Sequence, residues 1–218
     1  MPLSREAEGL IALQRGGSYS LARDALKHRI YDSRVFATTM TDATFFSQPI
    51  GSPWRIGVKT LSETNMYDNG KLPNGQVFLA TRMGIACISF ATPAAVTGQT
   101  MSQAFLNVLQ TSTFEVKIQG REFDYQIPGA QFTPMPIANF ALASAANGNR
   151  VGDMIAYGWS SFDPTPIVID QLVGFSVQHR LGNPDTNVVT VMSASCAVLN
   201  TGNCTMMVII EGLLTRAK

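Results

Sequence analysis

The sequence predicts an all-β protein, a sandwich of two antiparallel sheets with Greek-key connections. From about Val35 onward, short segments rich in Val, Ile, Phe and Thr alternate with clusters of Gly, Pro, Asn and Asp. This pattern is typical of strands joined by turns. Helical segments do not separate these strands regularly, as they would in a parallel α/β sheet. At 218 residues the chain is long enough for one large sandwich domain.

The expected strands differ in how many of their faces are covered. In "FEVKIQGREFDYQI", apolar and polar residues alternate on both sides of Gly120 and Arg121, which predicts a hairpin with one face on the core. The last segment, "CTMMVIIEGLL", is apolar on both faces except at Glu211, which predicts a central strand. In all, we expect strands near residues 35–47, 54–61, 76–90, 113–119, 122–127, 153–159, 166–180, 187–199 and 204–215.

The stretch "TNMYDNGKLPNGQVFLATRMGIACISF" holds two turn signals, at residues 68–70 and 73–75, followed by a long segment whose single charge is Arg82. The turns predict a polar loop, and the segment that follows predicts a long strand over 76–90. Because this strand carries so little charge, we expect a neighbouring molecule to cover its outer face.

Helical patterns are concentrated at the start of the chain. Residues 1–34 contain two helix-like segments, the first capped by Ser4 and ended by Gly16 and Gly17, the second over 18–32. They predict an N-terminal helical arm, residues 1–34, ahead of a sandwich at residues 35–218. The arm has only a small excess of basic side chains, so docking on a neighbouring subunit is favoured over binding nucleic acid. One short inserted helix is expected in "GQTMSQAFLNVLQTS".

The composition points to a surface that partners cover. Charged residues make up 14 % of the chain and the formal net charge is +1, whereas typical soluble chains are about 25 % charged. Uncharged polar surface is cheaper to bury against a partner than charged surface. There is no apolar run long enough to span a membrane, no secretory signal pattern, and only three cysteines, an odd number. We therefore expect a protein made in a reducing compartment.

No residue pattern predicts catalysis. The two histidines, His28 and His179, are far apart in the sequence, and the usual zinc motifs are missing. Ser160 and Ser161 lack the Gly-x-Ser-x-Gly elbow, and no glycine-rich phosphate loop is present. We expect no enzyme activity, no catalytic residue, no metal ligand and no cofactor, and we interpret His179 as a structural residue.

The order of parts resembles the jelly-roll coat proteins of tailless icosahedral bacteriophages. The resemblance covers nearly the whole chain and is carried by "DATFFSQPIG", "KTLSETNMYDNGKLPNGQVFLATRMGI", "TMSQAFLNVL", "TFEVKIQGREFDYQIPG", "PIVIDQLVGFSVQ" and "CTMMVIIEGLLTR". It implies a single jelly-roll β-sandwich of two antiparallel sheets. It also implies a structural virion protein, a capsid subunit that self-assembles into an icosahedral shell through arm, loop and sheet contacts. Its location would be the virion, after synthesis in the host cytoplasm.

This reading also predicts partners and contact residues. The partners would be copies of the chain and other capsid proteins, with an internal lipid membrane or the packaged genome left open as partners of the arm. No small-molecule substrate is expected. For Trp54 and Trp159, burial in the subunit's own core is an equal alternative to an interface. The expected subunit interface comprises Leu10, Ile11, Leu21, Leu26, Ile30, Trp54, Tyr67 and Trp159.

Two other function classes stay open. The first is a β-sandwich carbohydrate- or receptor-binding module, spike-like or lectin-like, with Trp54, Tyr67, Asp68 and Trp159 as candidate contacts. The second is a small jelly-roll enzyme of cupin or isomerase type. The sparse histidines disfavour it, because a metal cupin needs several histidines and an acid in one cluster.

Overall fold

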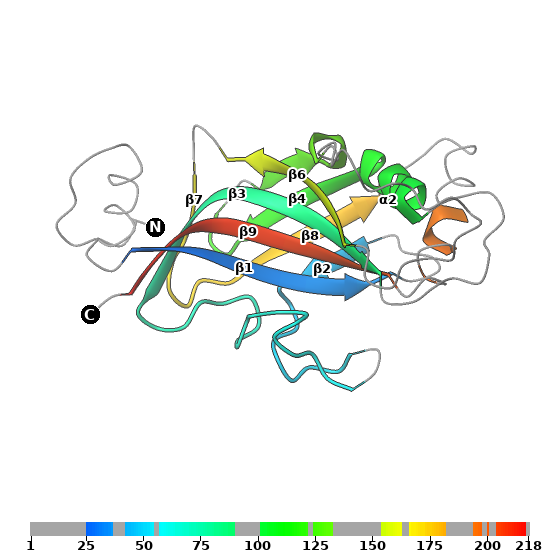
Figure 1. The fold of residues 1–218 in the computed structure, drawn as a ribbon. Coiled ribbons are helices and arrows are strands. Elements are labelled where there is room, and N and C mark those ends of the chain that lie inside the picture. Colours follow the sequence, from blue (N-terminus) through cyan, green and yellow to red (C-terminus); the bar gives the residue numbers. More distant parts are fainter. Residues whose placement is uncertain are drawn as a thin grey trace.

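The computed structural model describes residues 25–36, 42–54, 57–89, 101–121, 124–132, 154–162, 166–181, 194–197, 200 and 204–216. These residues form mainly β-strands, arranged in two antiparallel sheets that face each other (Figure 1). The prediction of an all-β protein with two antiparallel sheets is therefore confirmed.

The larger sheet, sheet A, has five strands in the order β1-β9-β3-β6, and β7 pairs with β3 on the same edge as β6. The smaller sheet, sheet B, has four strands in the order β2-β8-β4-β5. The strands of sheet A are β1 (Leu26–Val35), β3 (Gln76–Ser89), β6 (Met154–Ser161), β7 (Ile167–Ile169) and β9 (Cys204–Arg216). Those of sheet B are β2 (Asp42–Phe45), β4 (Ser112–Ile118), β5 (Tyr125–Pro128) and β8 (Phe175–Leu181).

Strand pairing is nested along the chain once β7 is set aside. The first strand pairs with the last, β1 with β9, and the second with the last but one, β2 with β8. Further inward, β3 pairs with β6 and β4 with β5. Successive pairs alternate between the two sheets. Within sheet A the two pairs are joined by β9 and β3, and within sheet B they are joined by β8 and β4. Apart from β7, the described strands thus follow the order of one long antiparallel hairpin whose successive strand pairs lie alternately in the two sheets.

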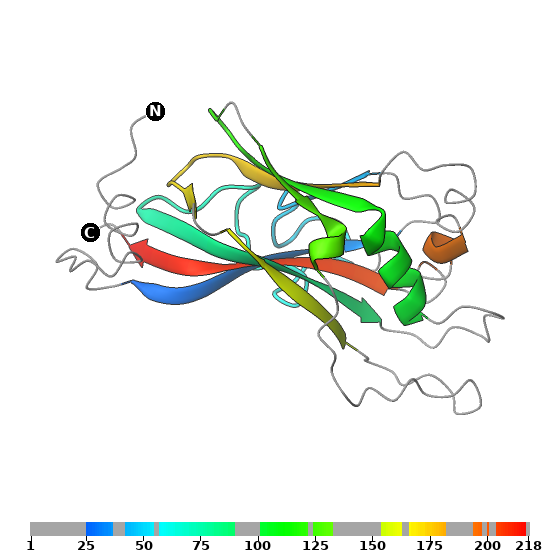
Figure 2. The same cartoon turned by 90° about the horizontal axis from the view of Figure 1, so that it is seen from above.

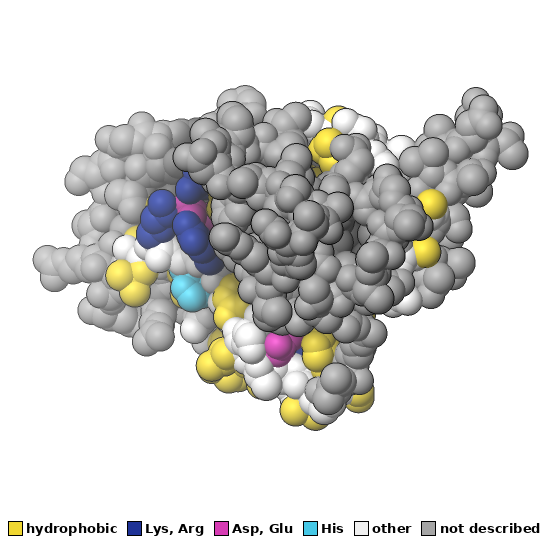
Figure 3. Space-filling model, turned by 45° about the vertical axis from the view of Figure 1, so that its right-hand side comes forward, with side chains coloured by type: hydrophobic (Ala, Val, Ile, Leu, Met, Phe, Trp, Pro, Cys, Tyr) yellow, Lys and Arg dark blue, Asp and Glu magenta, His cyan; other side chains and the backbone are white. Residues whose placement is uncertain are grey.

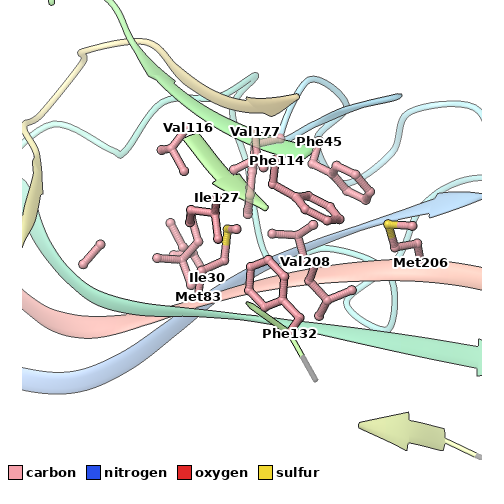
Figure 4. Packing of buried hydrophobic residues seen from close by; sticks show 14 of the residues in the cluster. Ile30, Phe45, Met83, Phe114, Val116, Ile127, Phe132, Val177, Met206 and Val208 are labelled. Atoms are coloured by element: carbon pink, nitrogen blue, oxygen red, sulfur yellow. The ribbon is translucent and has the colours of Figure 1, made fainter. Parts of the chain in front are cut away.

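The core lies between the two sheets, and both contribute large side chains to it. In Figure 4, Phe45, Phe114 and Val177 of sheet B lie opposite Met83 and Val208 of sheet A. Alternation places these residues inside, since every second side chain of a strand points to the same face. Burying such side chains contributes about 1.5–3 kcal/mol each, so this core is the main source of stability.

The helix α2 (Met101–Gln110) covers one end of the sheets, as Figure 2 shows. Its apolar stripe, predicted from the sequence, is buried at Ala104, Phe105, Val108 and Leu109. The ring of Phe105 meets that of Phe36, just beyond β1, edge to face at 5.8 Å between centroids. A short 3-10 helix, η2 (Gly129–Gln131), follows β5.

Several expected elements are confirmed: the long strand over 76–90, the hairpin around residue 120, the strands near 153–159 and 204–215, and the inserted helix. The last strand is central, as predicted, with β1 on one side and β3 on the other. It fits there partly because of Gly212, where an added Cβ would lie 1.9 Å from the backbone oxygen of Leu79.

The helix expected over residues 18–32 is wrong from Leu26 onward, because Leu26–Val35 forms β1 in full register with β9. The sequence signal was ambiguous, since Leu26 and Ile30 are four residues apart and share one face of either a helix or a strand. The expected arm–sandwich boundary at residue 34 is wrong for the same reason. The part of the arm before residue 25 lies outside the described residues.

Other strand predictions need correction. The segment expected over 54–61 is a loop in its described part, where Pro53 and Val58 make one isolated bridge. The segment expected over 166–180 is split into β7 and β8 by a turn in which Leu172 has a φ of 59°. Residues 194–197, expected as strand, are helical. These residues lack a strict alternation of apolar and polar side chains, so their local pattern is compatible with a helix as well as with a strand.

Candidate functional site

Residues 46–54 and 57–75, here called the edge loop, close the outer edge of sheet A. The edge strand of sheet A is β1, which pairs with β9 on one side, so its other side offers backbone groups that no strand of the sheet pairs. Asn65 accepts a hydrogen bond from the Tyr31 N–H at 3.0 Å and donates to the Arg29 carbonyl at 2.8 Å. Thr64 donates its hydroxyl to the Tyr31 carbonyl at 3.1 Å. The loop therefore satisfies much of this edge and presents its own outer surface instead.

A buried ion pair fastens the edge loop to β1. The Lys59 ammonium lies 2.5 Å from a carboxylate oxygen of Asp32, and both side chains have no solvent exposure. Lys59 also donates to the Ser33 carbonyl at 2.9 Å, while the other Asp32 oxygen accepts the Phe46 N–H at 2.6 Å. Burial lowers the pKa of Lys59, and its contact with Asp32 opposes that shift.

The two turns of the edge loop, at residues 68–70 and 73–75, hold the loop against sheet B. They contact the start of β8 and the turn that precedes β8. Gly70 has a φ of 56°, and a Cβ there would lie 2.3 Å from the Phe175 carbonyl oxygen. Its own carbonyl accepts the Phe175 N–H at 2.7 Å. Gly75 donates its N–H to the Gln171 side chain at 2.8 Å. Glycine suits both positions because the backbone is left-handed at each, and at Gly70 the Phe175 carbonyl also leaves no room for a Cβ.

The outer side of the edge loop exposes large apolar side chains. Val58 is 54 % exposed, Leu61 58 % and Tyr67 71 %. Elsewhere in the described residues, Leu26 and Leu172 are also exposed large apolar side chains. Apolar side chains on a loop anchored this firmly can be buried in a contact at little cost in chain entropy. The edge loop is therefore a candidate contact surface.

The outer face of sheet B is polar and its charges balance. Glu115 is nearly buried, with Arg180 at 3.1 Å and Lys117 at 3.5 Å from one carboxylate oxygen. Lys117 also lies 3.4 Å from Asp124, and the Gln126 amide donates to Glu115 at 3.1 Å. We call Glu115, Lys117, Asp124 and Arg180 the Glu115 cluster. Its two cations face two anions, which suits a hydrated surface.

The outer face of sheet A carries a different charge cluster, centred on Glu211. Glu211 lies directly opposite Arg29 on one neighbouring strand and Arg82 on the other. Arg29 donates to it at 2.7 Å and Arg82 at 2.8 Å and 2.5 Å, while the Lys27 ammonium is 3.1 Å away. We call Lys27, Arg29, Arg82 and Glu211 the Glu211 cluster. The space-filling view shows basic side chains gathered around acidic atoms (Figure 3).

The electrostatics of the Glu211 cluster follow from these contacts. Burial by itself would raise the pKa of Glu211, but its hydrogen bonds from Arg29, Lys27 and Arg82 outweigh burial and lower the pKa to about 2. Glu211 is therefore ionised throughout the neutral and mildly acidic range.

Trp159 of β6 lies beside this cluster. It is half-buried, with the guanidinium of Arg82 4.6 Å and that of Arg29 5.7 Å from its ring centroid. Its ring covers Gly84, where a Cβ would come within 2.9 Å of a ring carbon. Cation–π contacts of this kind hold both guanidinium groups over the sheet.

The predicted interface residues fall in different places. Leu26 and Tyr67 are exposed, as a contact residue must be, while Leu10, Ile11 and Leu21 lie outside the described residues. The prediction of Ile30 as an interface residue is wrong. Its side chain is 3 % exposed and belongs to the core, because it lies on the inner face of β1. Trp54 is half-buried, with the Lys59 ammonium 4.8 Å from its ring centroid.

The Glu211 cluster was missed from the sequence, although a signal was present. Arg82 is the single charge of a 14-residue strand, and Glu211 is the single acid of the last strand. An isolated cation and an isolated anion in two apolar strands indicate that the strands are neighbours, since each charge needs a partner when buried.

Of the serines and histidines considered for catalysis, Ser160 and His179 are buried, His28 is half-buried and Ser161 is exposed. His179 is fully buried in the core, and its Nε2 is 2.6 Å from the Ser112 hydroxyl. That hydroxyl donates to the Val108 carbonyl, so His179 must donate through Nε2. Nδ1 has no hydrogen-bond partner among the described residues. Burial lowers the pKa of His179 to about 4, so it is neutral near pH 7.

The neutral state of His179 makes stability depend on pH. The unfolded chain takes up a proton near pH 6.5 and the folded chain only near pH 4, so acid favours unfolding between these values. We expect the free energy of unfolding to fall by about 2 kcal/mol between pH 7.5 and pH 5. Urea unfolding at both pH values measures this. Half-buried His28, whose pKa is also lowered, is replaced by Gln in this experiment. Equal stability at both pH values would contradict the neutral assignment.

Among the described residues, no group of three or more His, Cys, Asp and Glu side chains is placed to hold a metal ion. An open depression of about 430 Å³ lies beside the β4–β5 turn, lined in part by Asn69, Lys117, Arg121 and Asp124. No helix in the described part of the chain is long and apolar enough to cross a membrane. Comparison with protein-family models, curated proteins and solved structures gave no match to this chain.

Proposed function

We propose that the chain is a structural virion protein, a capsid subunit built on a single jelly roll that assembles with copies of itself into an icosahedral shell. The observation that carries the proposal is the nested strand pairing, β1 with β9, β2 with β8, β3 with β6 and β4 with β5, split alternately between two facing sheets. A jelly roll is a double-sheet wrap of eight strands, and viral shell proteins are among its common uses. β7 is a short addition at the edge of β3.

The composition and the edge loop support the shell over a free monomer. Only 14 % of the residues are charged, so the subunit has little of the charge that keeps monomers apart. The edge loop presents Val58, Leu61 and Tyr67 on a firmly anchored backbone. In this proposal the loop contacts a neighbouring subunit, and residues 1–24 add further contacts. Closed shells need only modest energy at each contact, because symmetry repeats it many times.

A second candidate is a carbohydrate- or receptor-binding module. One observation favours it, the open depression lined by polar and charged side chains beside the β4–β5 turn. Binding of the purified monomer to a glycan array is the result that would move the assignment to this class.

We expect the double substitution Leu61→Ser and Tyr67→Ser to raise the protein concentration needed for assembly at least tenfold. Loss of one apolar anchor costs on the order of 1–2 kcal/mol for each subunit contact, and about 1.4 kcal/mol is a factor of ten. Light scattering over a concentration series measures this threshold. Because both side chains are exposed, the unfolding free energy is expected to stay within about 0.5 kcal/mol of wild type.

The matched control for this experiment is Asp68→Asn, an exposed polar change in the same loop, which should leave the threshold unchanged. If the double variant assembles at the wild-type concentration, the edge loop is not an assembly contact. An equal rise for Asp68→Asn would show a general effect of the loop rather than loss of apolar anchors.

A further inference from the structure

The Glu211 cluster carries a net positive charge, because its single acid neutralises only part of the charge of its cations. Its three cations, Lys27, Arg29 and Arg82, have side chains 69 %, 58 % and 38 % exposed, while Glu211, the one acid between them, is 3 % exposed. The Glu115 cluster on the other sheet has as many anions as cations, so the excess is particular to the outer face of sheet A. A surplus of exposed cations around a buried acid is a surface suited to an anion.

Most N–H donors of the cluster remain available. Arg29 contacts Glu211 through Nε alone, which leaves both terminal nitrogens of its guanidinium without an acceptor among the described residues. Arg82 uses Nε and one terminal nitrogen, and Lys27 makes one contact. Arg carries five donors and Lys three, so the cluster can bind several more acceptor oxygens.

The cations are also held in place before any ligand arrives. Arg29 and Arg82 lie on the two strands that flank Glu211, and Trp159 holds both guanidinium groups by its ring. Fixing these long side chains in advance removes much of the entropy cost that binding would otherwise carry.

The geometry of this cluster points to phosphate. A planar guanidinium fork binds phosphate oxygens in pairs, an ammonium adds a point charge, and guanidinium planes also stack on bases. We infer that the Glu211 cluster binds the phosphodiester backbone of a nucleic acid strand. The inference rests on the proposed function, because a shell supplies such a strand as its packaged genome. In such a shell, the outer face of sheet A would face the interior of the particle.

Two other occupants fit less well. A second copy of this chain would have to supply carboxylates, yet the whole chain holds 15 acidic residues among 218. An anionic membrane is usually recognised by about four to eight clustered basic residues, and this cluster has three. Trp159 is engaged with the two arginines and Gly84 rather than presented for insertion.

The test is fluorescence anisotropy with a labelled single-stranded oligodeoxynucleotide of about 20 nucleotides, on full-length protein below its assembly concentration. The double variant Lys27→Gln and Arg29→Gln should lose affinity about tenfold or more in low salt. The slope of log affinity against log salt should shrink by about 1.4, the value for two lost phosphate contacts on single-stranded DNA. Glu211→Gln, which removes the competing anion, should bind several-fold more tightly.

The matched control, Lys117→Gln and Arg180→Gln, removes the same charge from the opposite sheet and should change affinity less than twofold. The inference is overturned if the two double variants lose affinity equally, if wild type does not bind the oligonucleotide, or if it binds only anionic lipid vesicles. Unfolding curves of each variant verify that it is folded.

The outcome separates this inference from the proposed function. If the Lys27→Gln and Arg29→Gln variant binds DNA as tightly as wild type, and both proteins form particles, the proposed binding site is refuted and the proposed shell function is supported. If wild type never assembles, yet the variant loses DNA binding, the shell is refuted and the site stands.

Discussion

Replacing Asp32 with Asn should lower the free energy of unfolding by about 3–5 kcal/mol, the usual cost of removing one partner of a buried ion pair. Lys59 would lose its carboxylate partner in a site with no solvent exposure, where the Ser33 carbonyl and a neutral amide oxygen cannot balance its charge. The Phe46 N–H would also lose a charged acceptor. Since whole domains are stable by only about 5–15 kcal/mol, the loss would be a large fraction of the total.

Urea unfolding followed by circular dichroism measures this loss. The matched control is Asp68→Asn, the same chemical change on an exposed residue of the edge loop, for which we expect a change within about 0.5 kcal/mol. The double variant Asp32→Asn and Lys59→Met should lose less than Asp32→Asn alone, because no unpaired charge is left inside. A loss below about 1 kcal/mol for Asp32→Asn would contradict the buried pair.

Phe114→Ala should also cost about 3–5 kcal/mol, through lost burial and the cavity it leaves. Phe114 has no solvent exposure, and its ring lies 5.3 Å from that of Phe132 and 5.0 Å from that of His179. It projects from β4 into the space between the sheets (Figure 4). The cavity would thus open where the two layers meet, so the whole sandwich should unfold as one unit.

The matched control for Phe114→Ala is Tyr67→Ala, which removes an aromatic side chain that is 71 % exposed. Its unfolding free energy should stay within about 0.5 kcal/mol of wild type. Guanidinium unfolding monitored by fluorescence and by circular dichroism should give coincident curves for both variants. Equal losses in the two variants, or a Phe114→Ala loss near zero, would contradict the assignment of Phe114 to the core.

Local sequence patterns were sufficient to predict the elements whose tertiary environment favours the same structure as their own residues do. The hairpin of β4 and β5 alternates apolar and polar residues around a turn, and β3 and β9 are long, apolar and rich in β-branched residues. In α2 the apolar stripe at helical spacing decided the element. In each case the local preference and the tertiary environment point to the same structure.

Where local signals were ambiguous, contacts between distant residues decided the structure. Leu26 and Ile30 share one face whether residues 26–32 form a helix or a strand, and pairing with β9 settled the choice. The buried pair of Asp32 and Lys59 joins residues 27 positions apart, and the Glu211 cluster joins β1 and β3 to a strand far along the chain. No local pattern specifies such register, because it depends on how the sheets wrap.

The most direct test of the proposed shell is to image the purified protein by negative-stain electron microscopy, with its mass in the same sample measured by light scattering. Closed particles of uniform size with icosahedral symmetry are the predicted result. A population of single subunits at every concentration up to the solubility limit would contradict the account.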